Sequence, residues 1–401
     1  MMVKKRVLIL VVCLQFIAGS GGIFAQNNVT TSGEIYEQEL LAIVALIEQG
    51  ELDHALNKTE KIIKRYDSSR IAYVLKADIL RAMNGELPQF AAGLDSETRQ
   101  YKDFRHELSN RFSSQQDTTR SQYHNLLPAS VLDMGEHKYL LLAEMSTGRF
   151  FMFENKLGQP ELVKDYYMSI GKAGFGKQVE GDNKTPVGLY HVTREIDGST
   201  LPDLYGSGAF PVNYPNRVDR WRKRTGYGIW LHGTPSDTYS RAPLASEGCF
   251  VLSNDDYDDV APLIRSAEKP PVLLVETVEW LTPDQHQQRK QTYLGILNKW
   301  AEDWESLDVE RYLSHYNADS FNFGKDNFSE WSERKRQVGR GKEFIQLAIN
   351  VNGLFIYPGE EDMFMVDFKQ SYMSNNYQSQ SQKQQYWKKD STGNWKIIFE
   401  G

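Results

Sequence analysis

Short runs of β-forming residues fill the middle of this chain and constrain its fold more than any other feature. Glycine and proline residues separate the runs, a spacing typical of short strands joined by turns. The pattern predicts a mainly β domain, either a sandwich or an open barrel. Its best helix is expected from Asp255 to Ala267, because acidic residues in a first turn interact favourably with the helix dipole. The predicted strands are Tyr139 to Ala143, Phe150 to Phe153, Tyr166 to Ile170, Leu189 to Thr193, Ile229 to Leu231, Phe250 to Leu252 and Val272 to Val275.

Helical spacing marks the region before the β domain. Apolar residues such as Leu52 and Ala55 recur at helical intervals between residues 34 and 86, which predicts three helices. Residues 50–80 resemble one tetratricopeptide-like pair, but an array of such repeats needs several copies. Residues 26–125 are therefore interpreted as a helical docking region that ends in a polar linker.

The region after Pro283 combines one long helix with long strands. The helix is expected to extend to Tyr316, with Trp300 and Trp304 on its apolar side. The Gln/Ser run 378–385 is interpreted as a polar strand edge or hairpin. A helix followed by an antiparallel sheet resembles the NTF2-like (SnoaL-like) cone fold, whose members serve as enzymes, binding modules or dimerisation units. The predicted strands are Phe344 to Tyr357, Met363 to Tyr372, Gln382 to Lys388 and Trp395 to Phe399.

The first residues have the pattern of a secretory signal peptide. A basic group, Lys4 to Arg6, precedes an apolar run from Val7 to Ala18, which is too short for a typical membrane span. Cleavage after Ala25 is expected, and an uncleaved anchor is the alternative. No second long apolar run follows, so the mature chain is expected outside the cytoplasm and without an integral span. The predicted organisation is multidomain α+β: signal peptide 1–25, helical region 26–125, β domain 126–277 and C-terminal domain 283–401.

The chain has two cysteines, and only one of them remains after cleavage. Cys13 leaves with the signal peptide, so Cys249 has no intramolecular disulfide partner in an oxidising compartment. Composition leaves three interpretations open for Cys249: a buried inert thiol, an intermolecular disulfide or a nucleophile.

The neighbours of Cys249 favour the nucleophile. A cysteine nucleophile needs a base or an ion-pair partner, and His232 stands at the end of a predicted strand. Thirteen residues separate His232 from the sequence Ser246-Glu247-Gly248-Cys249. Gly248 lets the backbone bend tightly, so that the N–H groups around Cys249 can face a developing oxyanion.

These residues resemble the L,D-transpeptidase (YkuD) catalytic domain, in which a histidine and a spacer precede Ser/Thr-His-Gly-Cys. Two further segments resemble blocks of the family: GDNKTPVGLY from Gly181 to Tyr190, and AFPVNYPN from Ala209 to Asn216. The second block is that of a Gram-negative envelope branch. Four segments therefore agree in order, which identifies residues 126–277 as a member of this family.

The resemblance implies acyl transfer on peptidoglycan stem peptides in the periplasm. The Cys249 thiolate would attack the carbonyl on the L side of an L–D peptide bond and form a thioester. Attack by an amine would then give a cross-link or an attached protein, as in a transpeptidase. Attack by water would give a carboxypeptidase or an amidase that releases wall-attached lipoprotein. His232 would move the protons, Gly248 and Cys249 would supply oxyanion N–H groups, and Ser246 would orient the loop.

Two residues near Cys249 differ from the family's pattern, and both concern contacts to the substrate. Glu247 replaces the usual histidine before Gly-Cys, and Val251 replaces an arginine suited to a carboxylate. The basic cluster from Arg217 to Arg224 is either a carboxylate-binding group or a solvated loop. The residues expected to contact substrate are Gly233, Thr234, Glu247 and Arg224.

Composition and spacing disfavour several other classes of function. The net charge is -7, whereas a nucleic-acid binder usually has a basic surplus. The aspartates between residues 255 and 259 lack the Gly and Glu of an EF-hand loop. The histidines other than His232 show no metal-ligand spacing. We expect no metal, no cofactor and no nucleic-acid partner.

Three hypotheses remain from the sequence. In the first, the protein is an active enzyme with a readily alkylated Cys249, and the flanking domains recruit wall-attached lipoprotein or other envelope proteins. In the second, it is a non-catalytic peptidoglycan-binding adaptor with a sluggish thiol, and Cys249→Ala leaves wall binding unchanged. A third, a cysteine peptidase on protein substrates, leaves the GDNKTPVG and NYPN segments unexplained.

Overall fold

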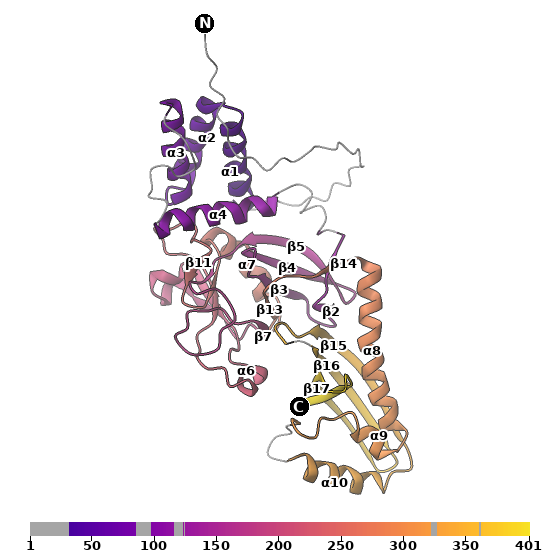
Figure 1. Cartoon of the computed structure of the whole chain (residues 1–401). Helices are drawn as coiled ribbons and strands as arrows, with labels where there is room; N and C mark the ends of the chain where they lie inside the picture. The colour runs from indigo at the N-terminus through magenta and orange to yellow at the C-terminus, as the bar shows by residue number, and fades with distance from the viewer. Residues whose placement is uncertain (1–31, 86–97, 116–122, 124, 322–326, 361) are drawn as a thin grey trace. The chain divides into compact units, whose positions relative to one another are not determined.

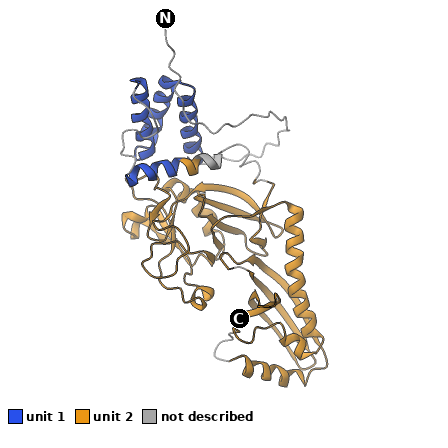
Figure 2. Ribbon diagram, viewed as in Figure 1, with its two compact units in different colours: residues 1–108 blue, residues 109–401 orange. Residues whose placement is uncertain are grey.

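The computed structural model describes residues 32–85, 98–115, 123, 125–321, 327–360 and 362–401 (Figure 1). It divides into two compact units, residues 1–108 and 109–401 (Figure 2). The predicted signal peptide, residues 1–25, lies outside the described residues, so export stays a prediction. No helix in the described ranges is long and apolar enough to cross a membrane.

The first unit contains the three predicted helices. Apolar residues at helical spacing, such as Leu40, Ile62 and Ile79, are fully buried between them. The Tyr36 hydroxyl on the first helix lies 2.6 Å from Ser69 Oγ, and that oxygen accepts a bond from the Ala72 N–H and so caps the third helix. The helices are α1 (Ser32–Glu48), α2 (Leu52–Arg65) and α3 (Arg70–Met83), and α4 (Arg99–Gln115) follows.

The middle of the chain is mainly β, as predicted, and its strands form separate sheets. The largest has the order β5-β4-β3-β13-β7, and a second has the order β12-β10-β9-β8. Apolar side chains such as Leu141, Phe210 and Phe250 form a buried core with α7 (Asn254–Arg265). The strands are β3 (Tyr139–Glu144), β4 (Arg149–Lys156), β5 (Gln159–Tyr167), β7 (Gly188–His191), β8 (Ile196–Asp197), β9 (Gly208–Pro211), β10 (Trp230–His232), β12 (Phe250–Val251) and β13 (Pro271–Val275).

Small elements complete the middle region. Two pairs of short strands form sheets of their own, β11 with β6 and β1 with β14. The loops carry two 3-10 turns and one short helix. These elements are β1 (Leu127–Pro128), β6 (Ile170–Gly171), β11 (Leu244–Ser246), β14 (Trp280–Leu281), η1 (Gly198–Thr200), η2 (Asp203–Tyr205) and α6 (Arg217–Trp221).

The C-terminal region is a curved antiparallel sheet with a long helix beside it (Figure 1). The sheet has the order β18-β17-β16-β15-β2, and aromatic residues such as Trp300, Phe364 and Trp387 fill the space between helix and sheet. The Gln/Ser run lies in β17, in the hairpin with β16, as expected. The elements are α8 (Pro283–Glu305), α9 (Val309–Leu313), α10 (Phe328–Gly339), β15 (Ile345–Ile356), β16 (Met363–Ser374), β17 (Tyr377–Lys389) and β18 (Trp395–Glu400).

Two features of this region differ from the sequence prediction. The long helix ends at Glu305 rather than Tyr316, because Leu307 adopts φ 65° and Asp308 caps the separate helix α9. Helix α10 was not predicted, because its sequence is mostly polar and its apolar residues are few.

One buried apolar cluster joins the middle and C-terminal regions, beside the core that each has of its own. Strand β2 (Val131–Asp133) precedes the first long strand of the middle region, yet it pairs with β15 as the fifth strand of the C-terminal sheet. Phe151 of β4 and Phe355 of β15 belong to the same buried cluster, and so does Val218 of α6. The C-terminal region is therefore built into the second compact unit, and its contacts reach helix α6.

Candidate active site

The pairing of two short strands brings the segments that carry His232 and Cys249 together. Strands β10 and β12 are parallel, with Leu231 opposite Phe250 and His232 opposite Val251. Leu231 and Phe250 are both fully buried in the core. Since side chains alternate along a strand, His232 projects from the opposite face of β10. Cys249 directly precedes β12, so both predicted catalytic residues lie at this strand pair.

The hydrogen bond of His232 determines which ring nitrogen accepts a proton. His232 Nδ1 lies 2.7 Å from the Gly233 carbonyl oxygen, which can only accept, so the neutral ring carries its proton on Nδ1. Nε2 is then the nitrogen with a free lone pair. Burial lowers the pKa of His232 to about 4, against the opposing effect of the Gly233 hydrogen bond. The ring is therefore neutral near pH 7 and ready to act as a base.

Cys249 is a half-buried free thiol. Its Sγ donates to the Gly228 carbonyl oxygen over 3.4 Å. Burial raises the pKa of Cys249 to about 11, although a hydrogen bond from the Trp230 backbone acts in the opposite direction. Both members of the pair are thus uncharged at rest, and this differs from the readily alkylated thiolate expected from the sequence.

We expect alkylation of Cys249 by iodoacetamide to be slow at pH 7 and to accelerate about tenfold per pH unit through pH 9. The raised pKa means that the thiol dominates below about 11, and only the thiolate reacts. Mass spectrometry of the labelled protein measures the rate. A rate that is already high at pH 6 and flat to pH 8 would contradict this account, because it would require a resting thiolate–imidazolium pair.

The turn before Cys249 is held by the Ser246 side chain. Ser246 Oγ donates to the Cys249 carbonyl oxygen at 2.6 Å and accepts from the Gly248 N–H at 3.1 Å. This geometry differs from the prediction that the Gly248 N–H faces an oxyanion, because that N–H is bonded within its own turn. The Cys249 N–H is the other donor that was predicted for an oxyanion. Its place in an oxyanion hole stays a prediction, and so does the orienting role of Ser246.

Gly248 is required by its backbone conformation and by its surroundings. Its φ is 128°, and a Cβ at this position would lie 2.9 Å from the Lys184 carbonyl oxygen. We expect Gly248→Ala to lower turnover by about 10²-fold, because a displacement near 1 Å at the nucleophile has that effect. Gly393→Ala is the matched control, since Gly393 has φ 85° with nothing within 4 Å. Equal turnover of Gly248→Ala and the control in a substrate assay would refute this role.

Two residues that the sequence analysis missed lie beside the pair. The Tyr205 ring is 5.1 Å from the His232 ring and 4.9 Å from the Trp230 ring, between centroids. The pKa of Tyr205 is raised first by burial and then by the charges of Cys249 and Glu247. The charge of Arg241 lowers the pKa of both His232 and Cys249. Tyr205 ends the short 3-10 turn η2 and Arg241 lies in an irregular loop, where no periodic pattern marks them.

The predicted substrate-contact residues fall into two groups. Glu247 is 84% exposed at the rim and pairs with Lys172 at 3.2 Å, so it is open to a ligand. Gly233 and Thr234 are buried, and the Thr234 N–H donates to Asn254 Oδ1 at 3.1 Å. Arg224 pairs with Asp219 at 3.1 Å and with Glu360 at 3.3 Å, so structural contacts hold its guanidinium. Substrate contact by all four stays a prediction.

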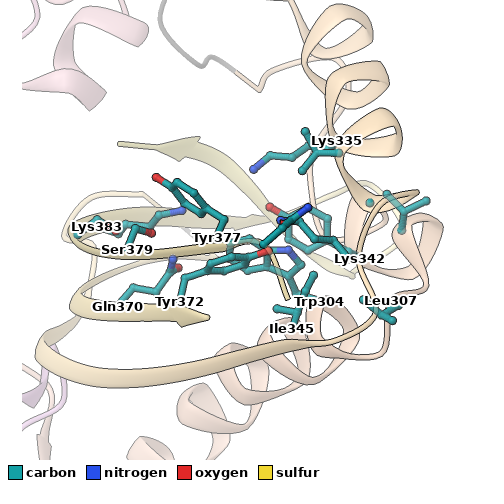
Figure 3. A pocket seen from close by; sticks show the side chains of 16 residues that line it. Trp304, Leu307, Lys335, Lys342, Ile345, Gln370, Tyr372, Tyr377, Ser379 and Lys383 are labelled. Atoms are coloured by element: carbon teal, nitrogen blue, oxygen red, sulfur yellow. The ribbon is translucent and has the colours of Figure 1, made fainter. Parts of the chain in front are cut away.

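A cavity with a volume of about 550 Å³ lies in the C-terminal domain. Lysines and aromatic residues line it: in Figure 3 the Lys335 side chain extends from α10 and the Lys383 side chain from β17. Burial lowers the pKa of Lys335 to about 8, and its Nζ is 5.3 Å from the Trp304 ring centre. This cavity is large enough for a small ligand. Among the described residues, no three His, Cys, Asp or Glu side chains gather as metal ligands.

The comparisons with known proteins agree with this geometry. Residues 138–275 match the YkuD family, the L,D-transpeptidase catalytic domain. Residues 292–401 match the Cds6 C-terminal NTF2-like domain. The solved structure of Bd1075 from Bdellovibrio bacteriovorus is 29% identical, with a TM-score of 0.61 over 69% of this chain and 97% of that one. The helical cell shape determining protein Pgp2 from Campylobacter jejuni is 27% identical, with a TM-score of 0.54 over 68% and 95%. No curated protein matches.

Proposed function

Because this chain carries a YkuD L,D-transpeptidase catalytic domain followed by an NTF2-like domain, we propose that it is a cysteine acyltransferase acting on peptidoglycan stem peptides. The observation that carries the proposal is the pairing of β10 with β12. It joins the strand that ends at His232 to the strand that Cys249 directly precedes, and the His232 imidazole is neutral with Nε2 free to accept a proton. This pair has the parts that a nucleophilic thiol needs.

The first half of the reaction forms a thioester. His232 Nε2 takes the Cys249 proton as Sγ attacks the carbonyl carbon on the L side of an L–D bond. The Cys249 N–H donates to the oxyanion that develops on the carbonyl oxygen. The C–N bond then breaks, and the leaving amine of the D-amino acid takes the proton from His232. The acyl group remains on Cys249, and His232 is neutral again.

The second half releases the acyl group. An amine or a water molecule gives a proton to His232 Nε2 and attacks the thioester carbonyl. The C–S bond breaks, and Sγ recovers the proton as a thiol. An amine acceptor makes the protein a transpeptidase, whereas water makes it a carboxypeptidase or an amidase. The chemistry at Cys249 and His232 is the same in each case.

The cellular setting of this reaction is part of the proposal. Pgp2 is a helical cell shape determining protein, and we extend a role in cell-wall remodelling and shape to this chain. Export through residues 1–25 to the periplasm brings the catalytic domain to peptidoglycan. The helical unit and the NTF2-like domain are the surfaces that recruit wall-attached lipoprotein or other envelope proteins.

One observation favours a second candidate, a non-catalytic peptidoglycan-binding adaptor. The resting Cys249 thiol is protonated, and Glu247 stands in place of the family's histidine. A slow alkylation rate agrees with both candidates, because a neutral pair can act when substrate is bound. Turnover is therefore the observation that separates them.

The proposed function is tested by incubating the mature protein with purified peptidoglycan that carries attached lipoprotein. Mass spectrometry of the muropeptides reports cross-links, amino-acid exchange and trimmed stems, and released lipoprotein is detected separately. New cross-links or exchange identify an amine acceptor, and trimmed stems or released lipoprotein identify water. Unchanged muropeptides, with folded protein bound to the wall, would contradict the enzyme and favour the adaptor.

A further inference from the structure

We propose that Glu360 of the C-terminal domain is a positioning residue for the acyl-transfer site. It fixes the segment 222–228, named here the anchored segment, whose last carbonyl contacts the Cys249 sulfur. The inference rests on the proposed function, and it gives the NTF2-like domain a part in shaping the catalytic site.

Glu360 is a buried carboxylate that faces two arginines of the catalytic domain and, at 3.8 Å, Lys388 of its own domain. Its side chain is 3% exposed. Arg222 Nε donates to Oε1 at 2.8 Å, and Arg222 Nη2 donates to Oε2, which makes a two-pronged contact. Arg224 Nη2 donates to Oε1 at 3.3 Å. One carboxylate of the C-terminal domain thus holds two arginines of the catalytic domain.

The chain just before the anchored segment is attached to the same domain. Asn216 Nδ2 donates to the Tyr357 hydroxyl at 2.7 Å, three residues before Glu360. Trp221 of α6 packs edge-on against Phe399, with ring centroids 5.8 Å apart. The anchored segment therefore begins from a fixed helix and is fixed again by Glu360.

The other end of the anchored segment contacts the loop that leads to Lys184, and it also contacts the Cys249 sulfur itself. The Thr225 N–H donates to the Gln178 carbonyl at 3.0 Å, and Thr225 Oγ1 accepts from the Glu180 N–H at 3.1 Å. These bonds hold the loop that continues to Lys184, whose carbonyl packs against Gly248. The segment itself ends at Gly228, whose carbonyl oxygen accepts a hydrogen bond from the Cys249 thiol. Loss of the Glu360 contacts therefore loosens the surroundings of the sulfur from both sides.

We expect Glu360→Gln to change thiol reactivity and turnover in opposite directions. When the Gly228 carbonyl moves away and water reaches Sγ, the thiolate becomes easier to form, so alkylation at pH 8 accelerates about tenfold. Turnover on stem peptides falls about tenfold or more, because the nucleophile is no longer aligned. A merely structural loss would not raise one rate while lowering the other in protein that remains folded.

Two variants provide matched comparisons. Asp362→Asn removes an exposed ion pair with Lys389, 2.6 Å long, two residues from Glu360, and is expected to change neither rate. Ile397→Ala destabilises the C-terminal core without touching the anchored segment, so it reports the effect of lost stability alone. The melting temperature of every variant is measured, and alkylation is compared well below it.

Glu360→Gln removes the anion shared by the part-exposed Arg222 and the buried Arg224, although Arg224 keeps Asp219, and the variant therefore has a risk of unfolding. Arg222→Gln is the second test, because the Arg222 side chain is 40% exposed and Arg224 keeps its contact with Glu360. It should shift both rates in the same directions by a smaller factor. Wild-type alkylation and turnover in folded Glu360→Gln or Arg222→Gln would overturn the proposal.

The alkylation measurement also separates this proposal from the proposed function. If wild-type protein leaves stem peptides unchanged, the proposed function fails. Faster alkylation of Cys249 in the Glu360 and Arg222 variants would still support the positioning role. Unchanged alkylation in both variants would overturn that role whatever the wild-type protein does to peptidoglycan.

Discussion

Replacement of Cys249 by alanine is expected to lower turnover of peptidoglycan stems by at least about 10³-fold, because no other group can form the thioester. Cys249 is the only described cysteine. Its sulfur donates a weak hydrogen bond to Gly228 and accepts one from the Trp230 backbone, and neither holds the core, so the alanine variant should keep the fold. Muropeptide mass spectrometry of the two proteins at equal concentration measures the loss.

The control for this variant is binding to the wall. Pull-down with purified peptidoglycan should give equal binding for wild type and Cys249→Ala, since the substitution leaves Glu247 and the C-terminal cavity untouched. Cys249→Ser keeps a hydroxyl of similar size but is a weaker nucleophile, and it should also lose turnover. Residual turnover of Cys249→Ala near the wild-type rate would refute a thioester on this residue.

Replacement of His232 by glutamine is expected to lower turnover by about 10²- to 10⁴-fold, the range of general acid–base catalysis. Glutamine has a side-chain N–H that can donate to the Gly233 carbonyl oxygen, as Nδ1 does, but it cannot accept and return the thiol proton. The substitution therefore separates the hydrogen bond from the proton transfer. Initial rates on a defined stem peptide measure the effect.

The pH dependence gives an independent check on His232. Because burial lowers its pKa to about 4, the imidazole is neutral and able to accept a proton above that pH. The wild-type kcat/KM should therefore rise as pH increases through about 4 and stay flat from pH 6 to 8. The residual activity of His232→Gln should lack the rise near pH 4. A wild-type rise centred near 6.5 would mean that His232 has an ordinary pKa and would contradict the buried geometry.

The sequence predicted the local elements better than the long-range pairings. Runs such as Tyr139 to Ala143 alternate with turn residues, and this local signal was enough for β3 and β13. The predicted YkuD and NTF2-like families are confirmed by the matches at residues 138–275 and 292–401. The pairing of β2 with β15 was not predicted, because its partners are more than two hundred residues apart and no local pattern records such a contact.

In the candidate site, too, the sequence predicted individual residues better than the contacts between them. The spacing of His232 and Cys249 singled out both residues, and in the structure His232 ends β10 while Cys249 directly precedes the neighbouring strand β12. Arg224 was assigned to substrate because its sequence context is basic, whereas its partners Asp219 and Glu360 appear only in three dimensions. The Gly248 N–H was predicted to donate to an oxyanion, whereas in the structure it donates a hydrogen bond to the Ser246 hydroxyl. A sequence shows which groups are available but not which of them are already hydrogen-bonded to one another.

The structure also gives the C-terminal domain an interpretation that differs from the one drawn from the sequence. From the sequence, residues 283–401 were a separate docking domain. In the structure, Phe355 and Phe399 share a buried cluster with Phe151 and Val218 of the catalytic region. A catalytic fragment without the C-terminal domain would expose that apolar surface to water. The site is therefore best studied in the full mature chain.

The most direct test of the central claim is the intact mass of the protein after mixing with a defined stem peptide that contains an L–D bond. The account predicts an adduct equal to the acyl part of the peptide, located on Cys249 by peptide mapping and removed by hydroxylamine, as a thioester is. His232→Gln should form it far more slowly, and Cys249→Ala should not form it. A stem peptide that is processed by the wild-type protein and by Cys249→Ala at equal rates, with no adduct on either, would contradict the account.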